Sequence, residues 1–506
     1  MAKRKLGNIT GKTSPIVLRV AIFAVAFLGT SAYILSQISD GEVLEVAPYF
    51  LLAIGMQFVP FFVRVTPEPF EPPGLNSITT LLALVPAFTT YVVNDAVQIN
   101  LLPQVSGRTR IELIQTVMIA YMLGTLSYLA GYYVGIGKRI TGIFPDLAGG
   151  TWRRSRLIHV SLAAMALFIP AYAYFQARVG ANLTDVTQLA AGKAVWREDA
   201  TLSWLLRSVA LGFVPPILFV ALNFPKLRWG RAIATVGLLA LVSFLTVRLG
   251  QRGTAAYCIL NALIIVHYLG RRIPLGVLVG IGFGLLVVTN LLGAYRQTRA
   301  DQIGTTNGPV MTIDATRTLT EHEEDRERIA AVAVVFHYFP ERKDFLLGES
   351  WGPVLTTFIP RWIWPDKGYL FMWRETAIVR QLVGAPVPVN YLGLLYANFS
   401  WFGIVLGMFG WGAFQRGLYE WFIKNDKDRS IVVLYSVYVL YVGPTLLQLS
   451  AALGFVLPIY VALRYIRIAP PKPKKQAILG IQASPPAALP ASSPTLPVPS
   501  PSPAAE

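Results

Sequence analysis

The sequence predicts an all-α polytopic membrane protein with about 12 transmembrane helices and one large, partly helical external loop. The first observation is its composition, because 54% of the 506 residues are hydrophobic and only 14% are charged, outside the usual range of soluble proteins. The second is a series of apolar stretches of roughly 18 to 23 residues, the length that a helix needs to cross about 30 Å of hydrocarbon. Strands of a barrel would be shorter and would alternate polar with apolar residues, so the spanning elements are helices.

The chain divides at its longest polar interruption. Predicted helices 1–9 lie in residues 1–294 and helices 10–12 in residues 389–467. The first apolar run follows a basic segment and lacks a small-residue cleavage site, which is typical of an uncleaved first helix. The last apolar stretch is too long for one crossing and just long enough for two. The predicted spans are 16–35, 45–63, 77–93, 112–135, 157–176, 202–223, 231–248, 254–269, 273–294, 389–413 and two within 430–466.

Basic loops predict the orientation, because Lys and Arg near helix ends resist translocation. With the basic N-terminal segment inside, the even-numbered loops are cytoplasmic, and all but the first are rich in positive charge. The segment after the last helix is also basic, which requires an even number of crossings. We therefore expect a multi-pass protein of the bacterial cytoplasmic (inner) membrane with both termini in the cytoplasm. The predicted cytoplasmic loops include Arg64 and residues 137–156, 225–231, 270–272 and 415–429.

Charge and cysteine usage exclude several classes of site. The formal net charge of +17 would suggest a nucleic-acid partner in a soluble protein, but here it reflects basic cytoplasmic loops and an anionic substrate, and we expect no nucleic acid. The single cysteine, Cys258, lies in an apolar segment, so no disulfide framework or thiolate metal site forms within one chain. The four histidines are scattered, and Asp426 and Asp428 lie among basic residues as a solvated charge run. We expect no metal and no cofactor.

Two regions differ from the membrane helices. Residues 295–388 form the predicted external loop, in which Thr320 and Glu323 have the spacing of a capping box and indicate a helix over about 321–338. The aromatic, proline-containing segment 351–373 suits the boundary between membrane and water. Residues 468–506 are rich in Pro, Ala and Ser and are predicted to be a disordered cytoplasmic tail.

Arginines at the predicted outer face are the main candidates for binding. Arg248 and Arg252 are four residues apart and Arg296 and Arg299 three apart, so each pair shares a helix face if its helix continues that far. Guanidinium groups suit phosphate, because they stay charged and donate in a fork that matches two oxygens. Single arginines could instead contact lipid head groups or acidic loop residues, but the cluster as a whole favours a binding site for a diphosphate. The cluster comprises Arg207, Arg248, Arg252, Arg296, Arg299, Arg361 and Arg374.

His337 is the first candidate for a general base, since it lies at the apolar end of the predicted loop helix. A single histidine is more often structural, so the alternatives stay open. They are His322, Asp301, Glu341, Asp344, Glu349 and Asp366.

Three features in residues 200–466 carry a family resemblance. They are the Arg252–Gly253 element in GQRGT, the long external loop with IPRWIWPDKG, and the segment NYLGLLYANFSWFGIVLGMFGWG that follows it. In these features the chain resembles the Wzy-type O-antigen and exopolysaccharide polymerases, which polymerise oligosaccharide repeat units. The first five helices match only in general character.

The resemblance implies a GT-C-like fold and a metal-independent glycosyltransferase. Such an enzyme takes a glycan from undecaprenyl diphosphate on the outer face and transfers its reducing end to the terminal hydroxyl of another lipid-linked unit. Its expected partners are undecaprenyl-diphosphate-linked oligosaccharide, the lipid bilayer and a chain-length regulator protein. The expected catalytic residues are His337, Arg252 and Arg296, and the expected substrate-binding residues are Arg207, Arg248, Arg299, Arg361, Lys367 and Trp364.

Two other functions fit the same pattern. An O-antigen ligase would use the same donor with a lipid A core acceptor, and only the acceptor would distinguish it. A transporter or flippase of lipid-linked oligosaccharide would carry charged groups near the bilayer midplane and broken helices there. The spans are largely uncharged at their centres and the polar groups gather at one face, which favours an enzyme.

Overall fold

The computed structural model is mostly helical over the residues that it describes. All of these belong to one compact unit, residues 1–468, and the predicted tail beyond 468 lies outside them. The described residues are 27–29, 32, 41–63, 68–93, 110–147, 149–179, 209–224, 229–248, 252–270, 272–274, 277–278, 280–282, 284, 332–351, 363–364, 389–444 and 446–468.

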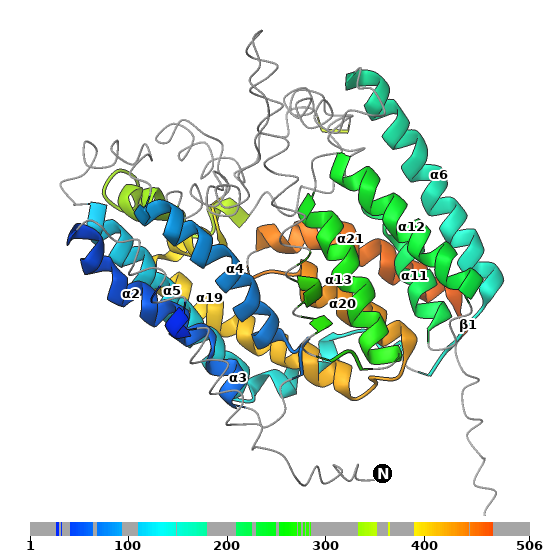
Figure 1. The fold of residues 1–506 in the computed structure, drawn as a ribbon, viewed down its shortest axis with the longest axis horizontal. Coiled ribbons are helices and arrows are strands. Elements are labelled where there is room, and N and C mark those ends of the chain that lie inside the picture. The colour runs from blue at the N-terminus through cyan, green and yellow to red at the C-terminus, as the bar shows by residue number, and fades with distance from the viewer. Residues whose placement is uncertain are drawn as a thin grey trace, which may run out of the picture. The chain divides into compact units, whose positions relative to one another are not determined.

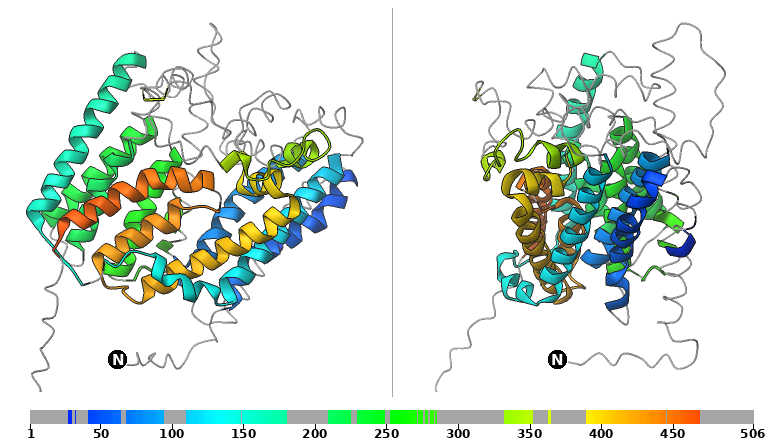
Figure 2. Two further views of the ribbon diagram at one scale, coloured as in Figure 1. Left: turned by 180° about the vertical axis from the view of Figure 1, so that it is seen from behind. Right: turned by 90° about the vertical axis from the view of Figure 1, so that its left-hand side faces the viewer.

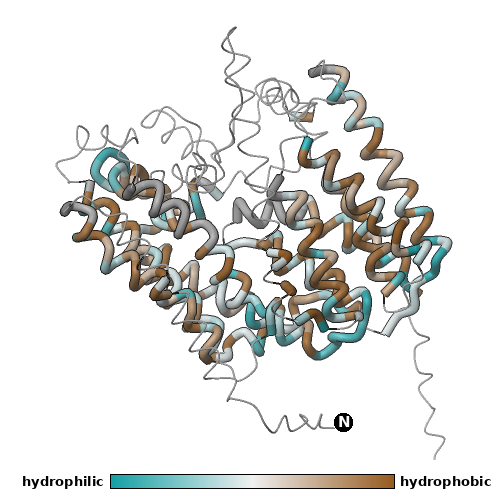
Figure 3. The backbone as a smooth tube through the Cα atoms, viewed as in Figure 1, coloured by the Kyte–Doolittle hydropathy of each residue, from teal (hydrophilic) through white to brown (hydrophobic). Residues whose placement is uncertain are grey.

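Within these residues, five helices are long and apolar enough to cross a membrane. They are Leu44–Val63, Ile111–Tyr133, Arg154–Tyr174, Trp229–Arg248 and Tyr391–Ile423. Apolar residues make up most of the length of the helices, and hydrophilic residues gather at many helix ends (Figure 3). The described chain is therefore an all-α membrane protein, as predicted, while the total of 12 spans and the GT-C-like architecture stay predictions.

One group of helices is built around α5 and α19, which pack against each other over much of their length (Figure 1). Small residues permit this approach, since a Cβ atom at Gly131 would overlap the carbonyl oxygen of Phe409, and one at Gly412 would overlap that of Tyr128. The two helices run in the same direction, as their predicted crossings require. The group comprises α2 (Gly41–Gln57), α3 (Val59–Val63), α4 (Pro72–Val93), α5 (Arg110–Tyr133), η2 (Ile136–Ile143) and α19 (Tyr391–Ile423).

A second set of mutually contacting helices includes the last two of the chain (Figure 1). It comprises α6 (Arg154–Val179), α10 (Val209–Gly212), α11 (Val214–Asn223), α12 (Trp229–Arg248), α13 (Arg252–Leu269), α20 (Arg429–Tyr441) and α21 (Leu446–Ile466). Two short strands, β1 (Thr151–Trp152) and β2 (Arg467–Ile468), pair antiparallel and join the start of α6 to the end of α21. The stretch 430–466 is thus divided in two, although α20 has only 13 residues, or about 20 Å of helix.

The structure corrects the bounds of the predicted span 389–413. Helix α19 continues to Ile423, and its backbone leaves helical geometry at Phe399 and Ser400, where φ of Ser400 is +60°. A short helix over 391–398 therefore precedes the long one. It folds back along the long helix, since a Cβ atom at Gly403 would overlap the carbonyl oxygen of Leu395. The predicted span ended at 413, before the polar pair Gln415 and Arg416, whose side chains have partners on other elements.

Loops predicted to lie on one side of the membrane contact one another. Arg272, after α13, forms an ion pair of 3.1 Å with Glu68, before α4. The backbone N–H of Gly149 donates to the Asp428 carboxylate over 2.8 Å. The pairing of β1 with β2 connects the loop before α6 to the segment after α21. These contacts agree with the predicted alternation of crossings, and which face is cytoplasmic stays a prediction.

Candidate functional site

The described segment 332–351 of the predicted external loop is held against α19 at the break in that helix. Backbone N–H groups of Leu346 and Leu347 donate to the carbonyl oxygens of Ala397 and Asn398, each over 2.9 Å, where the short helix ends. The buried Asn398 side chain accepts from the N–H of Gly348 over 3.2 Å. Carbonyls at a helix end lack partners within the helix, and here the loop supplies them. The segment 332–351 accordingly lies against the start of α19 (Figure 2).

His337 lies at the end of a helical segment, 332–338, which is the described part of the predicted loop helix. Its side chain is fully buried, and its Nδ1 lies 3.7 Å from Oε2 of Glu341, whose side chain is 40% exposed. The neighbouring Phe336 ring stacks on Tyr396 with 3.9 Å between ring centroids, which packs the segment onto the short helix. The imidazole is therefore enclosed, and Glu341 is the accessible member of the pair.

Arg248 is the last residue of α12 and is fully buried. Its Nη1 donates to the hydroxyl of Tyr172, on α6, over 3.0 Å. Helix α13 begins at Arg252, so the two arginines lie on different helices, on either side of a short connection. The condition for a shared helix face, one helix that continues from Arg248 to Arg252, is therefore not met. The sequence between the two helices contains Gly250, a residue type that commonly follows the end of a helix.

Other predicted binding residues are described in part or not at all. Trp364 is described and its side chain is 45% exposed. The side chain of Arg252 is not described. Arg207, Arg296, Arg299, Arg361, Arg374 and Lys367 lie outside the described residues, as do His322, Asp301 and Asp366.

Among the described residues, the structure does not join His337 to Arg248. His337 follows Phe336, which stacks on Tyr396 of α19, whereas Arg248 bonds to α6. The predicted site thus has two described parts, a loop segment with a histidine–carboxylate pair and a buried arginine at a helix end. In the same residues, no three His, Cys, Asp or Glu side chains are grouped so that they could hold a metal ion.

A row of hydrogen-bonded hydroxyl groups along α5 was missed by the sequence prediction. Its members are Tyr121, Thr125, Tyr128 and Tyr132, whose spacing places them along one face of the helix. Each hydroxyl bonds to another element: Tyr121 to Asn390 over 2.6 Å, Thr125 to Gln57 over 2.8 Å, Tyr128 to Gln415 over 2.5 Å and Tyr132 to Glu71 over 2.8 Å. The spacing is visible in the sequence, but the partners come from α2, from the residue before α4 and from both ends of α19.

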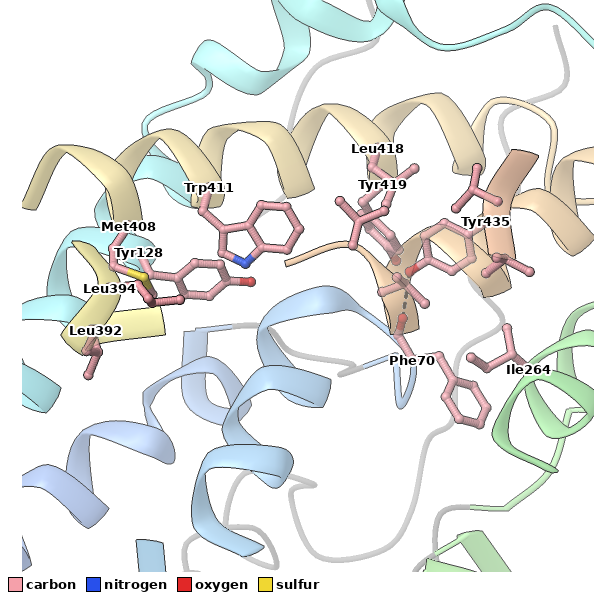
Figure 4. Close-up of a cluster of buried hydrophobic side chains, with 14 of the residues drawn as sticks. Phe70, Tyr128, Ile264, Leu392, Leu394, Met408, Trp411, Leu418, Tyr419 and Tyr435 are labelled. Atoms are coloured by element: carbon pink, nitrogen blue, oxygen red, sulfur yellow. Dashed lines mark hydrogen bonds between the residues drawn. The ribbon is translucent and has the colours of Figure 1, made fainter. Parts of the chain in front are cut away.

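Charged groups lie at the Tyr132 end of this row. Glu71 is buried, and the guanidinium of Arg416 lies 5.3 Å from the ring centroid of Tyr132. Arg416 also pairs with Glu420, one turn later on α19. The nearby core is aromatic, with Trp411 and Tyr128 on one side of Figure 4 and the Tyr435 hydroxyl donating to the carbonyl of Phe70 over 2.6 Å on the other. Buried ionisable groups are rare inside membrane proteins and mark functional positions.

Comparison with known proteins provides no relative for this chain. No protein-family model, no curated protein and no solved structure matches it.

Proposed function

We propose that this protein is a metal-independent glycosyltransferase of the bacterial inner membrane that polymerises undecaprenyl-diphosphate-linked oligosaccharide repeat units on the outer face. The observation that carries the proposal is the buried guanidinium of Arg248 at the predicted outer end of an apolar helix, four residues before Arg252. A cation at that position is costly inside a membrane, and retention of positive charge in the cytoplasm does not require it. An anionic substrate accounts for it.

The reaction needs fixed positive charge and a base. The terminal hydroxyl of the acceptor attacks the anomeric carbon of the donor glycan, the bond from that carbon to the diphosphate oxygen breaks, and the hydroxyl proton passes to the base. Negative charge develops on the leaving diphosphate, and guanidinium groups stabilise it by charge-assisted hydrogen bonds. Arg248, Arg252 and Arg296 are proposed for this role. The remaining proposed substrate contacts are Arg207, Arg299, Arg361, Lys367 and Trp364.

The His337–Glu341 pair is the proposed base. Glu341 is exposed and lies 3.7 Å from the enclosed imidazole, so the carboxylate would meet the acceptor hydroxyl and the histidine would hold the carboxylate in place. A chain-length regulator protein is proposed as a partner on the same face of the membrane.

The test uses purified protein with its lipid-linked oligosaccharide and measures chain length by gel electrophoresis. Wild-type protein should lengthen the glycan without nucleotide or added metal. Arg252→Ala and Arg296→Ala should abolish lengthening, and cells carrying them should accumulate single repeat units on lipid carriers of the outer leaflet. Arg231→Ala is the matched control, because Arg231 is an exposed arginine at the other end of α12 and should be dispensable.

Unchanged polymer ladders in Arg252→Ala, Arg296→Ala and Arg361→Ala would overturn the proposal. Transfer to a lipid A core acceptor, with no lengthening of lipid-linked units, would identify an O-antigen ligase instead.

Transport of the same lipid-linked oligosaccharide is a second candidate, favoured by the broken helix of α19 and the buried Glu71. Transporters commonly combine interrupted helices with ionisable groups inside the bundle. Accumulation of unpolymerised carriers on the inner leaflet of cells without the protein would support transport, and accumulation on the outer leaflet would support the polymerase.

A further inference from the structure

The start of α6 and the end of α21 form one joint. Strands β1 and β2 pair with Thr151 opposite Ile468 and Trp152 opposite Arg467. The N–H of Arg153 adds a bond of 3.1 Å to the carbonyl of Ile466. The start of α6 and the end of α21, more than 300 residues apart in the sequence, are therefore held side by side.

This joint gathers five arginines. Arg153, Arg154 and Arg464 are exposed, and in the described part of the chain no carboxylate lies within ion-pair distance of these three. The joint therefore presents a concentrated positive charge. Its members are Arg153, Arg154, Arg156, Arg464 and Arg467.

Two of the arginines are held in place by aromatic residues of α21. Arg156 donates from Nη1 to the carbonyl of Tyr465 over 3.1 Å and lies 5.5 Å from the centroid of its ring. Arg464 lies 5.9 Å from the centroid of the Tyr460 ring. Ordering these long side chains in advance lowers the entropy lost when a ligand binds.

The helix itself adds to the positive potential. Arg154 and Arg156 lie in the first turn of α6, which contains no acidic residue. The N-terminus of a helix carries partial positive charge, so cations there are unfavourable unless an anion is present. Basic residues keep a loop on the cytoplasmic side, which explains why each segment contains them. This does not require that two distant segments bring their basic residues together.

Apolar surface adjoins the arginines on both helices. Within about two turns of the joint, Ile158 and Leu162 of α6 and Leu457 and Val461 of α21 are exposed. Leu162 and Val461 are 63% and 56% exposed, respectively. A ligand bound here therefore meets an anion-binding end and an apolar flank. A free anion or a nucleotide uses only the first.

We propose that the joint of α6, α21, β1 and β2 binds an anionic phospholipid, with the phosphate on the arginines and the acyl chains along the exposed apolar residues. The arginine cluster and the apolar flank together match the two halves of such a lipid. The site is distinct from the proposed glycosyltransferase site and stands independently of that function.

The test is native mass spectrometry of the full-length protein with added phosphatidylglycerol or phosphatidylcholine of the same acyl chains. The variant is Arg153→Gln/Arg154→Gln/Arg464→Gln. The control is Arg139→Gln/Arg231→Gln/Lys424→Gln, which removes the same charge from exposed residues outside the joint. At roughly fivefold in affinity for each cation near a lipid surface, the joint variant should lose on the order of 100-fold in phosphatidylglycerol affinity. The control should lose far less.

Two outcomes would overturn the proposal. One is a wild-type protein that binds phosphatidylglycerol and phosphatidylcholine equally well. The other is an equal loss in the joint variant and in the control, which would indicate a general effect of net charge. If the triple variant does not fold, Arg464→Gln alone should reduce phosphatidylglycerol affinity about fivefold, and unchanged affinity would contradict the site.

Discussion

Replacing Gln415 by methionine should remove the hydrogen bonds that join α19 to α4 and α5 at this position. Its Oε1 accepts from the Tyr128 hydroxyl over 2.5 Å and from Nδ2 of Asn76 over 2.9 Å, and Gln415 is only 1% exposed. Methionine has a similar volume but removes the strong acceptor, so both donors lose a buried partner. Interhelical hydrogen bonds in membranes average about 0.6 kcal/mol and reach about 1.7 kcal/mol. Loss of two should lower the free energy of unfolding by about 1–3 kcal/mol.

A double-mutant cycle isolates the bond between Tyr128 and Gln415. Tyr128→Phe alone removes one hydrogen bond, and the double variant with Gln415→Met should cost less than the sum of the single changes, by about 0.6–1.7 kcal/mol. The free energies are measured by equilibrium unfolding in mixed detergent, followed by circular dichroism.

The matched control combines Tyr128→Phe with Gln57→Met. Gln57 bonds to Thr125, on the same helix, and makes no contact with the Tyr128 hydroxyl among the hydrogen bonds of the described chain. This pair should be additive within about 0.5 kcal/mol. If the Tyr128–Gln415 pair is equally additive, the bond contributes no measurable stability and the reasoning about the α5 row fails.

Two further predictions concern α19. Gly412→Ala should lower the free energy of unfolding by about 1–3 kcal/mol, because its Cβ atom would meet the backbone of α5, whereas Gly410→Ala faces open space and should stabilise by up to about 1 kcal/mol. Opposite signs in thermal unfolding are expected, and a Gly412→Ala protein as stable as wild type would contradict the close packing. Ser400→Gly should stabilise by roughly 1 kcal/mol, because Ser400 has φ +60° and ψ −153°, and Ser400→Ala should not. Equal melting temperatures for these two variants would show that the backbone at Ser400 is not strained.

The class of the protein and the positions of most of the described helices were accessible from the sequence. Transfer of an apolar run from water to hydrocarbon is a local property of consecutive residues, so hydropathy locates helices such as α12 without knowledge of their neighbours. The same reasoning placed the loops of one side together, and contacts such as Arg272 with Glu68 agree with it.

The candidate site was less accessible. Spacing alone suggested that Arg248 and Arg252 share a helix face, but Arg248 ends α12 and Arg252 begins α13. Spacing also gave no sign that His337 is buried, because the segment that carries it packs through Phe336 on Tyr396 of α19, 60 residues later.

What the sequence by itself determined is a helical membrane protein whose basic segments alternate along the chain. What only the tertiary structure decided is where polar groups find partners. Gln415 and Arg416 resemble the end of a span in hydropathy, yet α19 continues there, with Gln415 bonded to Tyr128 and Asn76 and with Arg416 over the ring of Tyr132. Hydrogen bonds between distant segments offset the cost of burying polar groups. They cannot be predicted from the residues that are adjacent in the sequence.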